Sequence, residues 1–333
     1  MSKTLLKKLV QKYQKLSLSN SIWVKRFVFP VQVFHDIFND LCFDVYQVSG
    51  ERQLMFITSA EVLPYFIKNF CNDATITKTG EIYAWNLKKY IRKHDAVIIE
   101  MPEYLKPFFT DGIITVRWIR QELNPDDFNA DILKHIRERK KIFQFQPEFS
   151  TDMNEMKMFY EKIYRPYLEK RYKYAKIEDF ELWKQDLLKY PWELLVIEKN
   201  GIVVGGGCSV FHDGRYRQRI TALLDEGCLK EGAMAAIYYY SILRAKEKNV
   251  KIIDFGLSRP FLSDGVLINK RKWRAKIVPS GTKRIIYLKN LKKEGLIIVE
   301  EEKLKVIIFS EKNAKLMHYS NCGLELKIVE SGI

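Results

Sequence analysis

The chain has 333 residues, of which 47% are hydrophobic and 13% aromatic, enough to fill two ordinary hydrophobic cores. Its formal net charge of +15, from 56 basic and 41 acidic residues, favours an anionic partner such as nucleic acid, an anionic membrane surface or a phosphate-bearing cofactor. Genome-wide bias toward lysine and isoleucine is the alternative explanation of that charge.

The longest apolar-rich run, residues 233–243, is too short to cross a bilayer, and the N-terminus has no apolar segment followed by a cleavage site. We therefore expect a soluble cytoplasmic protein without a transmembrane segment. The five cysteines are far apart and form no C-x-x-C pair, so neither a disulfide framework nor a metal site is expected.

The first 140 residues alternate between helical and strand-like patterns. An amphipathic helix is predicted over residues 3–16, with leucines on one face and lysines on the other. Contact with an anionic membrane and packing against its own domain both fit this helix. A helix is expected at 60–70, and short strand-like runs lie at 42–48, 52–58, 95–102 and 112–119. The polar, basic stretch at 129–141 predicts a domain boundary near residue 140.

The second half carries the clearest pattern. Strands are predicted at 192–199, 202–211 and 215–225, joined by the turn dipeptides Asn200-Gly201 and Asp213-Gly214. These strands form an antiparallel meander. A helix over 233–248 follows, and then a strand at 250–255. A helix of that length allows this strand to pair parallel to the third one through a right-handed crossover.

The residues at 251–259 read KIIDFGLSR, like the activation segment of a protein kinase, in which the Asp of DFG holds magnesium. A kinase also needs an H-R-D catalytic loop before this segment and A-P-E after it, and neither is present. The glycine cluster at 205–207 does not fit G-x-G-x-x-G. The sequence therefore argues against a kinase.

The order meander, loop, helix, strand resembles the GNAT acyltransferase fold, and several motifs resemble its FemAB-like branch. Asp-Phe-Gly at 254–256 is followed by Ser258, by Asp264-Gly265 and by KRKWRAKI at 270–277. YRPYLEKRY at 164–172 is similar to a Tyr-x-Pro-Tyr … Arg-Tyr region that precedes the second acyltransferase domain of that group. The resemblance covers residues 95–285.

The resemblance implies where a phosphate-bearing donor would lie. In the GNAT fold the donor sits where two parallel strands splay apart, with its phosphates on the N-terminus of the following helix. The matching residues are Lys230, Gly232, Ala233 and Met234. The usual signature, Q/R-x-x-G-x-G/A, has Gln or Arg in place of Leu229 and a small residue in place of Met234. This departure leaves acyl-CoA (acetyl-CoA) and aminoacyl-tRNA open as donors, and Gly232 could equally be a plain helix-entry glycine.

The segment NKRKWRAK at 269–276 has five cationic residues around one tryptophan. With aminoacyl-tRNA as the donor, the resemblance implies that Lys270, Arg271 and Lys272 bind its phosphates. Trp273 would then be a stacking surface or a core anchor. A solvated basic strand edge is the alternative interpretation.

Three polar residues are candidates for catalysis. Asp225 ends the third strand, where many GNAT enzymes have a carboxylate base, and Asp254 and Ser258 lie at the mouth of the next strand. A base would need a pKa near 7. The alternative for Asp254 is structural, because an Asp two residues before a glycine accepts hydrogen bonds from the turn behind it.

We therefore expect an α+β fold of tandem GNAT-like domains, with mixed central sheets flanked by helices. The predicted parts are a degenerate N-terminal domain at 1–140, a C-terminal domain with the cleft at 141–289 and a β-rich extension at 290–333. The expected function is N-acyltransfer from acyl-CoA or aminoacyl-tRNA to an amine acceptor by direct attack in a ternary complex. The alternative is a catalytically inactive GNAT-like basic module that binds RNA or an anionic membrane surface. The acceptor stays open.

Overall fold

The computed structural model describes residues 42–49, 54–59, 62–70, 75–94, 96–109, 112–171, 177, 179–279 and 284–289, and strands at 296–300, 303–309, 314–320 and 323–329. The chain divides into two compact units. The first comprises Met1–Val116 and Lys283–Lys293, and the second comprises Arg117–Thr282 and Glu294–Ile333. The amphipathic helix predicted at 3–16 lies outside the described residues. In the described part of the chain, no helix is both long and apolar enough to cross a membrane.

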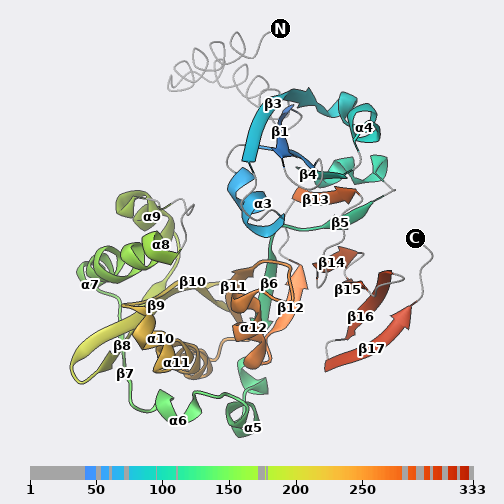
Figure 1. Ribbon diagram of the computed structural model, residues 1–333. Coiled ribbons are helices and arrows are strands. Elements are labelled where there is room, and N and C mark those ends of the chain that lie inside the picture. Colours follow the sequence, from blue (N-terminus) through green and yellow to red (C-terminus); the bar gives the residue numbers. More distant parts are fainter. Residues whose placement is uncertain are drawn as a thin grey trace, which may run out of the picture. The chain divides into compact units, whose positions relative to one another are not determined.

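The first unit contains a six-stranded mixed sheet in the order β3-β1-β2-β4-β13-β5 (Figure 1). Only β2 and β4 pair in parallel, and the other neighbours are antiparallel. Every residue of β4 is buried, and β4 lies inside the sheet between β2 and β13. The strands are β1 (Cys42–Ser49), β2 (Leu54–Thr58), β3 (Thr75–Tyr83), β4 (Ala96–Pro102), β5 (Ile113–Thr115) and β13 (Arg284–Lys289). The helices are α3 (Leu63–Phe70), α4 (Ala84–Arg92) and η1 (Glu103–Phe108).

The second unit contains a seven-stranded sheet in the order β12-β6-β11-β10-β9-β8-β7. Its strands are β6 (Ile119–Leu123), β7 (Gln146–Ser150), β8 (Trp192–Lys199), β9 (Ile202–His212), β10 (Arg215–Leu223), β11 (Ile252–Ser258) and β12 (Lys276–Pro279). Strands β8, β9 and β10 form the predicted antiparallel meander, and β11 pairs in parallel with β10. Helix α11 (Ala233–Glu247) makes the crossover. The second unit therefore has the strand and helix order of the GNAT fold, as expected.

The two predicted hairpin turns adopt the left-handed conformations that their residues favour. Asn200 and Gly201 have φ of 55° and 75°, and Asp213 and Gly214 have φ of 51° and 68°. Asn-Gly and Asp-Gly tolerate this region and match the twist of the flanking strands. These turns fix the register of the meander.

Helices cover both faces of the second sheet (Figure 1). On one face α11 packs with Leu195, Tyr216 and Phe255 in one core, whereas Leu194 and Ile220 belong to a second core on the other face. That second core includes side chains from α7 (Met153–Phe159), the π-helical turn η3 (Tyr160–Tyr164) and α9 (Phe180–Leu187). Helix α8 (Arg165–Arg171) continues directly from η3. Alternate strand residues thus face opposite helical layers.

The glycine cluster of β9 is explained by close packing. A Cβ on Gly206 would lie 3.1 Å from the ring of Phe159 and still closer to the carbonyl oxygen of Leu195 in β8. Only a glycine allows the helical layer to approach the strand this closely. The cluster therefore serves the core of the second unit and does not bind phosphate.

The domain boundary lies at residues 116–117 instead of near residue 140. Strand β6 pairs with β11 and β12 and so belongs to the second sheet. The stretch at 129–141, predicted as a junction, contributes Ile132 and Ile136 to the core around α11, and Ile142 directly after it joins the same core. The stretch contains α5 (Ala130–Lys134) and most of α6 (Arg139–Ile142). The short helix η2 (Pro125–Asp127) precedes it. The polar composition of the stretch led to the wrong prediction of a junction, because it outweighed the few isoleucines that are buried.

The strand predicted at 112–119 is two separate strands, β5 in the first unit and β6 in the second. The β-rich extension predicted at 290–333 forms a four-stranded antiparallel sheet of its own, in the order β14-β15-β16-β17. Its strands are β14 (Leu296–Glu300), β15 (Lys303–Phe309), β16 (Ala314–Ser320) and β17 (Gly323–Val329).

Candidate active site

Strands β10 and β11 separate after three paired residues. Residues 215–217 pair in parallel with residues 252–254, and the ladder then ends. Beyond this point β10 stays paired with β9 as far as Leu223, whereas β11 pairs with β6 as far as Ser258. The register of each strand shifts at the separation, between Gln218 and Ile220 in β10 and between Asp254 and Leu257 in β11. A wedge therefore opens between the two strands.

Gly256 makes the bend of β11. It has φ of 75°, which favours glycine, and a Cβ there would lie 3.3 Å from the carbonyl oxygen of Gln218. Its amide donates a hydrogen bond to Asp254 Oδ1 at 2.8 Å. The Asp-Phe-Gly motif thus forms the Asx-type turn that was the structural alternative for Asp254.

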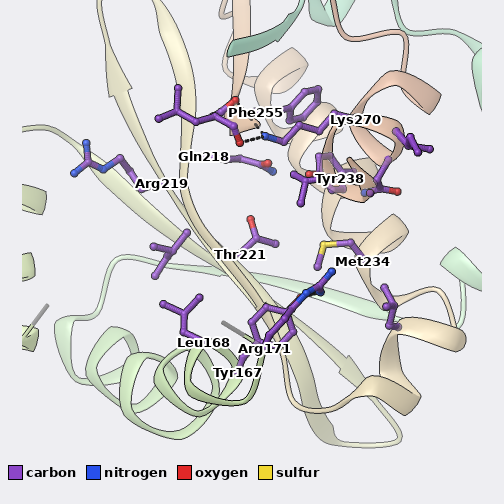
Figure 2. Close-up of a pocket in the computed structure, with 18 of the residues that line it drawn as sticks. Tyr167, Leu168, Arg171, Gln218, Arg219, Thr221, Met234, Tyr238, Phe255 and Lys270 are labelled. Carbon is purple, nitrogen blue, oxygen red and sulfur yellow. Dashed lines mark hydrogen bonds between the residues drawn. The ribbon is translucent and has the colours of Figure 1, made fainter. Parts of the chain in front are cut away.

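The wedge holds a cavity of about 470 Å³ (Figure 2). Its walls come from β10, β11, the start of α11, helix α12 (Gly265–Lys272) and the η3–α8 segment. Figure 2 shows Arg171, Thr221 and Met234 converging on this space from three of these elements. Most of the lining is apolar or aromatic: Tyr164, Tyr167, Leu168, Ile220, Leu229, Met234, Tyr238, Phe255, Leu257, Val266 and Ile268.

The charges of the cavity are of one sign. Its lining includes Arg171, Arg219, Lys270 and Lys272, and no Asp or Glu is among the described residues that line it. Arg219 is directed away from the others in Figure 2, and its guanidinium pairs with Asp186. The remaining basic groups suit a ligand that carries phosphate or carboxylate. No cluster of three or more His, Cys, Asp or Glu side chains that could hold a metal occurs in the described ranges.

Lys270 is the buried cation of the cavity, with 3% of the residue exposed. Its Nζ donates hydrogen bonds to the carbonyl oxygens of Gly256, at 3.1 Å, and Leu257, at 2.9 Å (Figure 2). Burial lowers the pKa of Lys270 to about 7, although the carboxylates of Asp254 and Asp264 oppose the shift. Lys270 therefore holds the bend of β11 through these hydrogen bonds. The sequence had suggested instead that Lys270 is a surface ligand for phosphate.

Asp254 lies on the other face of β11 from the cavity and is fully buried. Arg217 Nε donates to its Oδ2 at 2.8 Å, and Arg120 of β6 pairs with the same oxygen. These ion pairs and the hydrogen bond from Gly256 occupy the carboxylate. Asp254 thus joins three strands where β10 and β11 separate, and it does not contact the cavity.

Ser258 is also structural. It is buried, and its Oγ donates to Gln121 Oε1 at 2.7 Å. Gln121 Nε2 in turn donates to the carbonyl oxygen of Leu267 at 3.3 Å, which ties β6 to α12. Asp264 caps α12 by accepting from the amide of Leu267 at 2.8 Å. Ser258 does not line the cavity.

Asp225 lies outside the cavity as well. It is exposed and caps α10 (Glu226–Lys230), accepting from the amide of Cys228 at 2.8 Å. Hydrogen bonds from the backbone and the side chain of Cys228 hold the pKa of Asp225 below its ordinary value, which is the wrong direction for a general base at neutral pH.

The predicted phosphate residues divide into two groups. Met234 lines the cavity at the start of α11, a helix that begins without a side-chain cap. Lys230, Gly232 and Ala233 do not line it. Gly232, with φ of 94°, is the left-handed entry residue of α11, and a Cβ there would approach the α6 segment, 3.3 Å from the Cβ of Lys141. The helix-entry interpretation therefore describes Gly232.

The first half of the basic segment at 269–276 is the end of helix α12, and only Lys276 belongs to a strand, β12 at the edge of the sheet. Lys272 lines the cavity and is exposed, whereas Arg271 does not line it. Trp273 is buried, with 1% exposed, and its ring stacks on Tyr238 at 6.0 Å between centroids. Trp273 is thus a core anchor.

The structure adds residues that the sequence did not single out: Tyr167, Arg171, Gln218, Thr221 and Tyr238. The first two lie in YRPYLEKRY, so the resemblance marked their segment without assigning roles. The π-helical turn η3 directly before α8 is a feature that often accompanies functional sites. The sequence marked Gln218 more weakly, because it is a polar residue at a position of β10 where the strand pattern places buried side chains.

A buried polar group holds α11 on the sheet. Tyr216 OH donates to Glu193 Oε1 at 2.9 Å, and Arg244 Nε lies 3.1 Å from both oxygens of Glu193. Burial raises the pKa of Tyr216, and the hydrogen bond to Glu193 raises the pKa of Arg244. The group lies away from the cavity and fixes the helix that forms one of its walls.

No protein-family model matches the chain, and neither does any curated protein sequence. Solved structures resemble it at low identity. FemX is 13% identical with a TM-score of 0.42, over 73% of this chain and 82% of its own. The C-terminal domain (DUF2156) of a candidate lysylphosphatidylglycerol synthetase from Agrobacterium fabrum is 10% identical with a TM-score of 0.41, over 75% and 82%. A GCN5-related N-acetyltransferase from Kribbella flavida is 12% identical with a TM-score of 0.33, over 71% and 80%. Because these identities and TM-scores are low, the chemistry of this chain has to be inferred from the residues of its own cavity.

Proposed function

We propose that the chain is an acyltransferase whose second unit carries the active site and moves an acyl or aminoacyl group from a phosphate-bearing donor to an amine. The observation that carries this proposal is the separation of β10 and β11 over a cavity of about 470 Å³. The edge of β10 beyond Arg217 has no paired strand on the cavity side among the described residues. An extended donor with amide groups can bind such an open strand edge through backbone hydrogen bonds.

The donor's phosphates would lie at the end of the cavity formed by Arg171, Lys272 and the start of α11. The two cations supply charge, and the first amides of an uncapped helix supply hydrogen-bond donors. Acyl-CoA carries its phosphates at the far end of the pantetheine arm from its thioester, and aminoacyl-tRNA carries them in the nucleotides next to its ester. The phosphates of either donor would suit this end. The resemblance to FemAB-like enzymes favours tRNA, and the GNAT order of the strands favours coenzyme A.

Lys270 is the group we assign to proton transfer. A neutral lysine amine has two N–H groups, which can donate to the carbonyl oxygens of Gly256 and Leu257, and one lone pair that remains for a third partner. A pKa of about 7 keeps much of the side chain neutral at neutral pH. Lys270 would take a proton as the acceptor nitrogen bonds to the acyl carbon. It would return that proton to the thiolate or ribose oxygen that leaves when the C–S or C–O ester bond breaks.

The second candidate function, a catalytically inactive basic module that binds RNA or an anionic membrane surface, has the net charge of +15 and the altered phosphate signature in its favour. The buried lysine in the wall of a cavity favours the enzyme, because a binding surface has no need of a desolvated cation. The acceptor is an amine of unspecified class.

The test is transfer of a radiolabelled acyl group from acetyl-CoA, from longer acyl-CoAs and from charged tRNA, with several amines as acceptors. We expect transfer from at least one donor in the wild type and its loss in Lys270→Met, while Asp225→Asn, outside the cavity, remains active. Absence of both transfer and donor-induced thermal stabilisation would remove the proposal. Steeply salt-dependent RNA binding in that case would favour the binding module.

A further inference from the structure

One end of a buried glutamine amide is left open in the cavity wall. Gln218 is the first residue of β10 beyond its last pair with β11, and only 6% of it is exposed. Its Nε2 donates to Ser241 Oγ on α11 at 2.9 Å. Its Oε1 is buried and has no hydrogen-bond partner among the described residues. Buried side-chain acceptors nearly always accept a hydrogen bond, so we expect a bound ligand to donate one to this oxygen.

A second buried glutamine in the same sheet shows the contrast. Gln121 is fully buried and lies outside the cavity, and both ends of its amide are used: Nε2 on the carbonyl of Leu267 and Oε1 on Ser258 Oγ. Turning the amide of Gln218 over does not remove the difference, because Ser241 has one hydroxyl and satisfies one end at a time. Of these two buried glutamines, the one whose amide oxygen has no partner among the described residues is the one that lines the cavity.

The position of Gln218 along the cavity determines which part of a bound donor lies beside it. The proposed phosphate end is formed by Arg171, Lys272 and the start of α11, and the wedge narrows toward the last strand pair at Arg217. A donor bound along the open edge of β10 therefore brings its acyl end toward Gln218. Tyr238 and Phe255, which also line the cavity, are buried and apolar there, with rings 5.0 Å apart, so little water competes for the amide.

We infer that Gln218 is a specificity-determining residue whose Oε1 accepts a hydrogen bond from an uncharged hydroxyl or amide N–H on the transferred acyl group. The uncharged class follows from the lining, which has no carboxylate among the described residues, so an ammonium on the acyl group would lose its water without gaining a counter-ion. This inference rests on the proposed function and adds the class of acyl group. A plain alkyl acyl group leaves Oε1 unpaired and is the poorer substrate.

The test compares four three-carbon acyl groups: propionyl, 2-hydroxypropionyl, 3-hydroxypropionyl and 2-aminopropionyl. Each is supplied on coenzyme A and on tRNA, and kcat/KM is measured with one amine acceptor. On the carrier that the wild type uses, we expect a hydroxylated group to exceed both propionyl and aminopropionyl by about 10-fold or more.

Two variants probe the residue itself. Gln218→Met, similar in length and apolar, should lower kcat/KM for the hydroxylated group about 10-fold and make it equal to propionyl. Gln218→Glu should improve the aminopropionyl donor relative to the others, because a carboxylate attracts an ammonium. The matched control is Gln121→Met, which loses hydrogen bonds outside the cavity. It should lower the melting temperature and leave the order of donors unchanged.

The outcomes separate the two levels of the proposal. Transfer without preference for a hydroxylated group, or a preference that survives in Gln218→Met, overturns the role of Gln218 and leaves the acyltransferase standing. Preference for aminopropionyl over the hydroxylated groups overturns the uncharged class. Failure of all four groups on both carriers overturns the acyltransferase and this inference together. If Gln218→Met does not fold, the wild-type order of donors and Gln218→Glu still decide the matter.

Discussion

Arg217 and Asp254 are joined twice, as the last parallel pair between β10 and β11 and through their side chains, with Arg217 Nε donating to Asp254 Oδ2 at 2.8 Å. The carboxylate is fully buried and also pairs with Arg120. The point at which the two strands separate is therefore fixed by an ion pair on the face opposite the cavity.

Replacing Asp254 with Asn should destabilise the chain by about 3 kcal/mol, because two arginines lose their shared counter-ion in a partly buried site. Urea unfolding followed by circular dichroism would measure the change in the free energy of unfolding. Asp225→Asn is the control, since Asn also caps helices and the site is exposed. Magnesium should not change the melting temperature of the wild type. An Asp254→Asn variant as stable as the wild type would contradict the structural role.

The stability of the chain should depend on pH through Lys270. Its pKa is about 7 in the folded chain and 10.5 ordinarily. Between these values the unfolded chain holds a proton that the folded chain has released, so raising the pH favours the folded state. The free energy of unfolding of the wild type, relative to Lys270→Met, should rise from pH 7 to pH 9 and stay constant below pH 6. A difference that does not change with pH across this window would count against the buried cation.

Activity should depend on pH through the same residue. If Lys270 accepts the acceptor's proton, kcat in the wild type should rise as the pH approaches 7 and then level off. Lys270→Met should lower kcat about 100-fold, with little change in KM, and remove this step from the pH profile. Lys272→Met, in the same helix, serves as the comparison, because loss of an exposed cation should act on KM. A pH step that remains in Lys270→Met would assign the proton transfer to another group.

Donor binding should depend on Arg171. Replacement with Gln should raise KM for the donor about 10-fold and leave kcat unchanged, because a charge–phosphate contact is lost equally in the ground and transition states. Steady-state kinetics at two salt concentrations would show the effect shrinking as salt rises. Arg165→Gln is the matched control, since Arg165 lies in the same helix, pairs with Glu169 and does not line the cavity. Equal effects of the two variants would remove the specific role of Arg171.

Local chemistry made the meander predictable from the sequence. Asn200-Gly201 and Asp213-Gly214 specify tight turns by their own conformational preferences, and the change from strand to helix period at Ala233 marks α11. The boundary near residue 140 failed because three isoleucines spaced four and six residues apart, at 132, 136 and 142, are buried within a polar stretch. Burial there depends on α11, which follows much later in the chain.

The site was less predictable than the fold, because its residues change role with their surroundings. Lys270 lies in a run of basic residues typical of a solvated surface, yet helix α12 turns it toward the bend of β11. Asp225 follows the end of β10 and caps α10, and Asp254 lies within β11 and pairs with arginines, although the sequence made both candidates for catalysis. Gln218 becomes a candidate only because its Oε1 has no hydrogen-bond partner among the described residues, and a sequence pattern cannot show this.

The path of the chain between the two units has a consequence for synthesis on the ribosome. The first unit needs β13 beside β4, yet β13 begins at Arg284, after residues 117–279 have been made for the second sheet. Until then β4 lacks one of its two neighbours and leaves an apolar strand edge open to pairing with other chains. The seven-stranded sheet of the second unit is complete first, because its last strand, β12, ends at Pro279. We expect nascent chains halted before residue 284 to be the species that recruits chaperones.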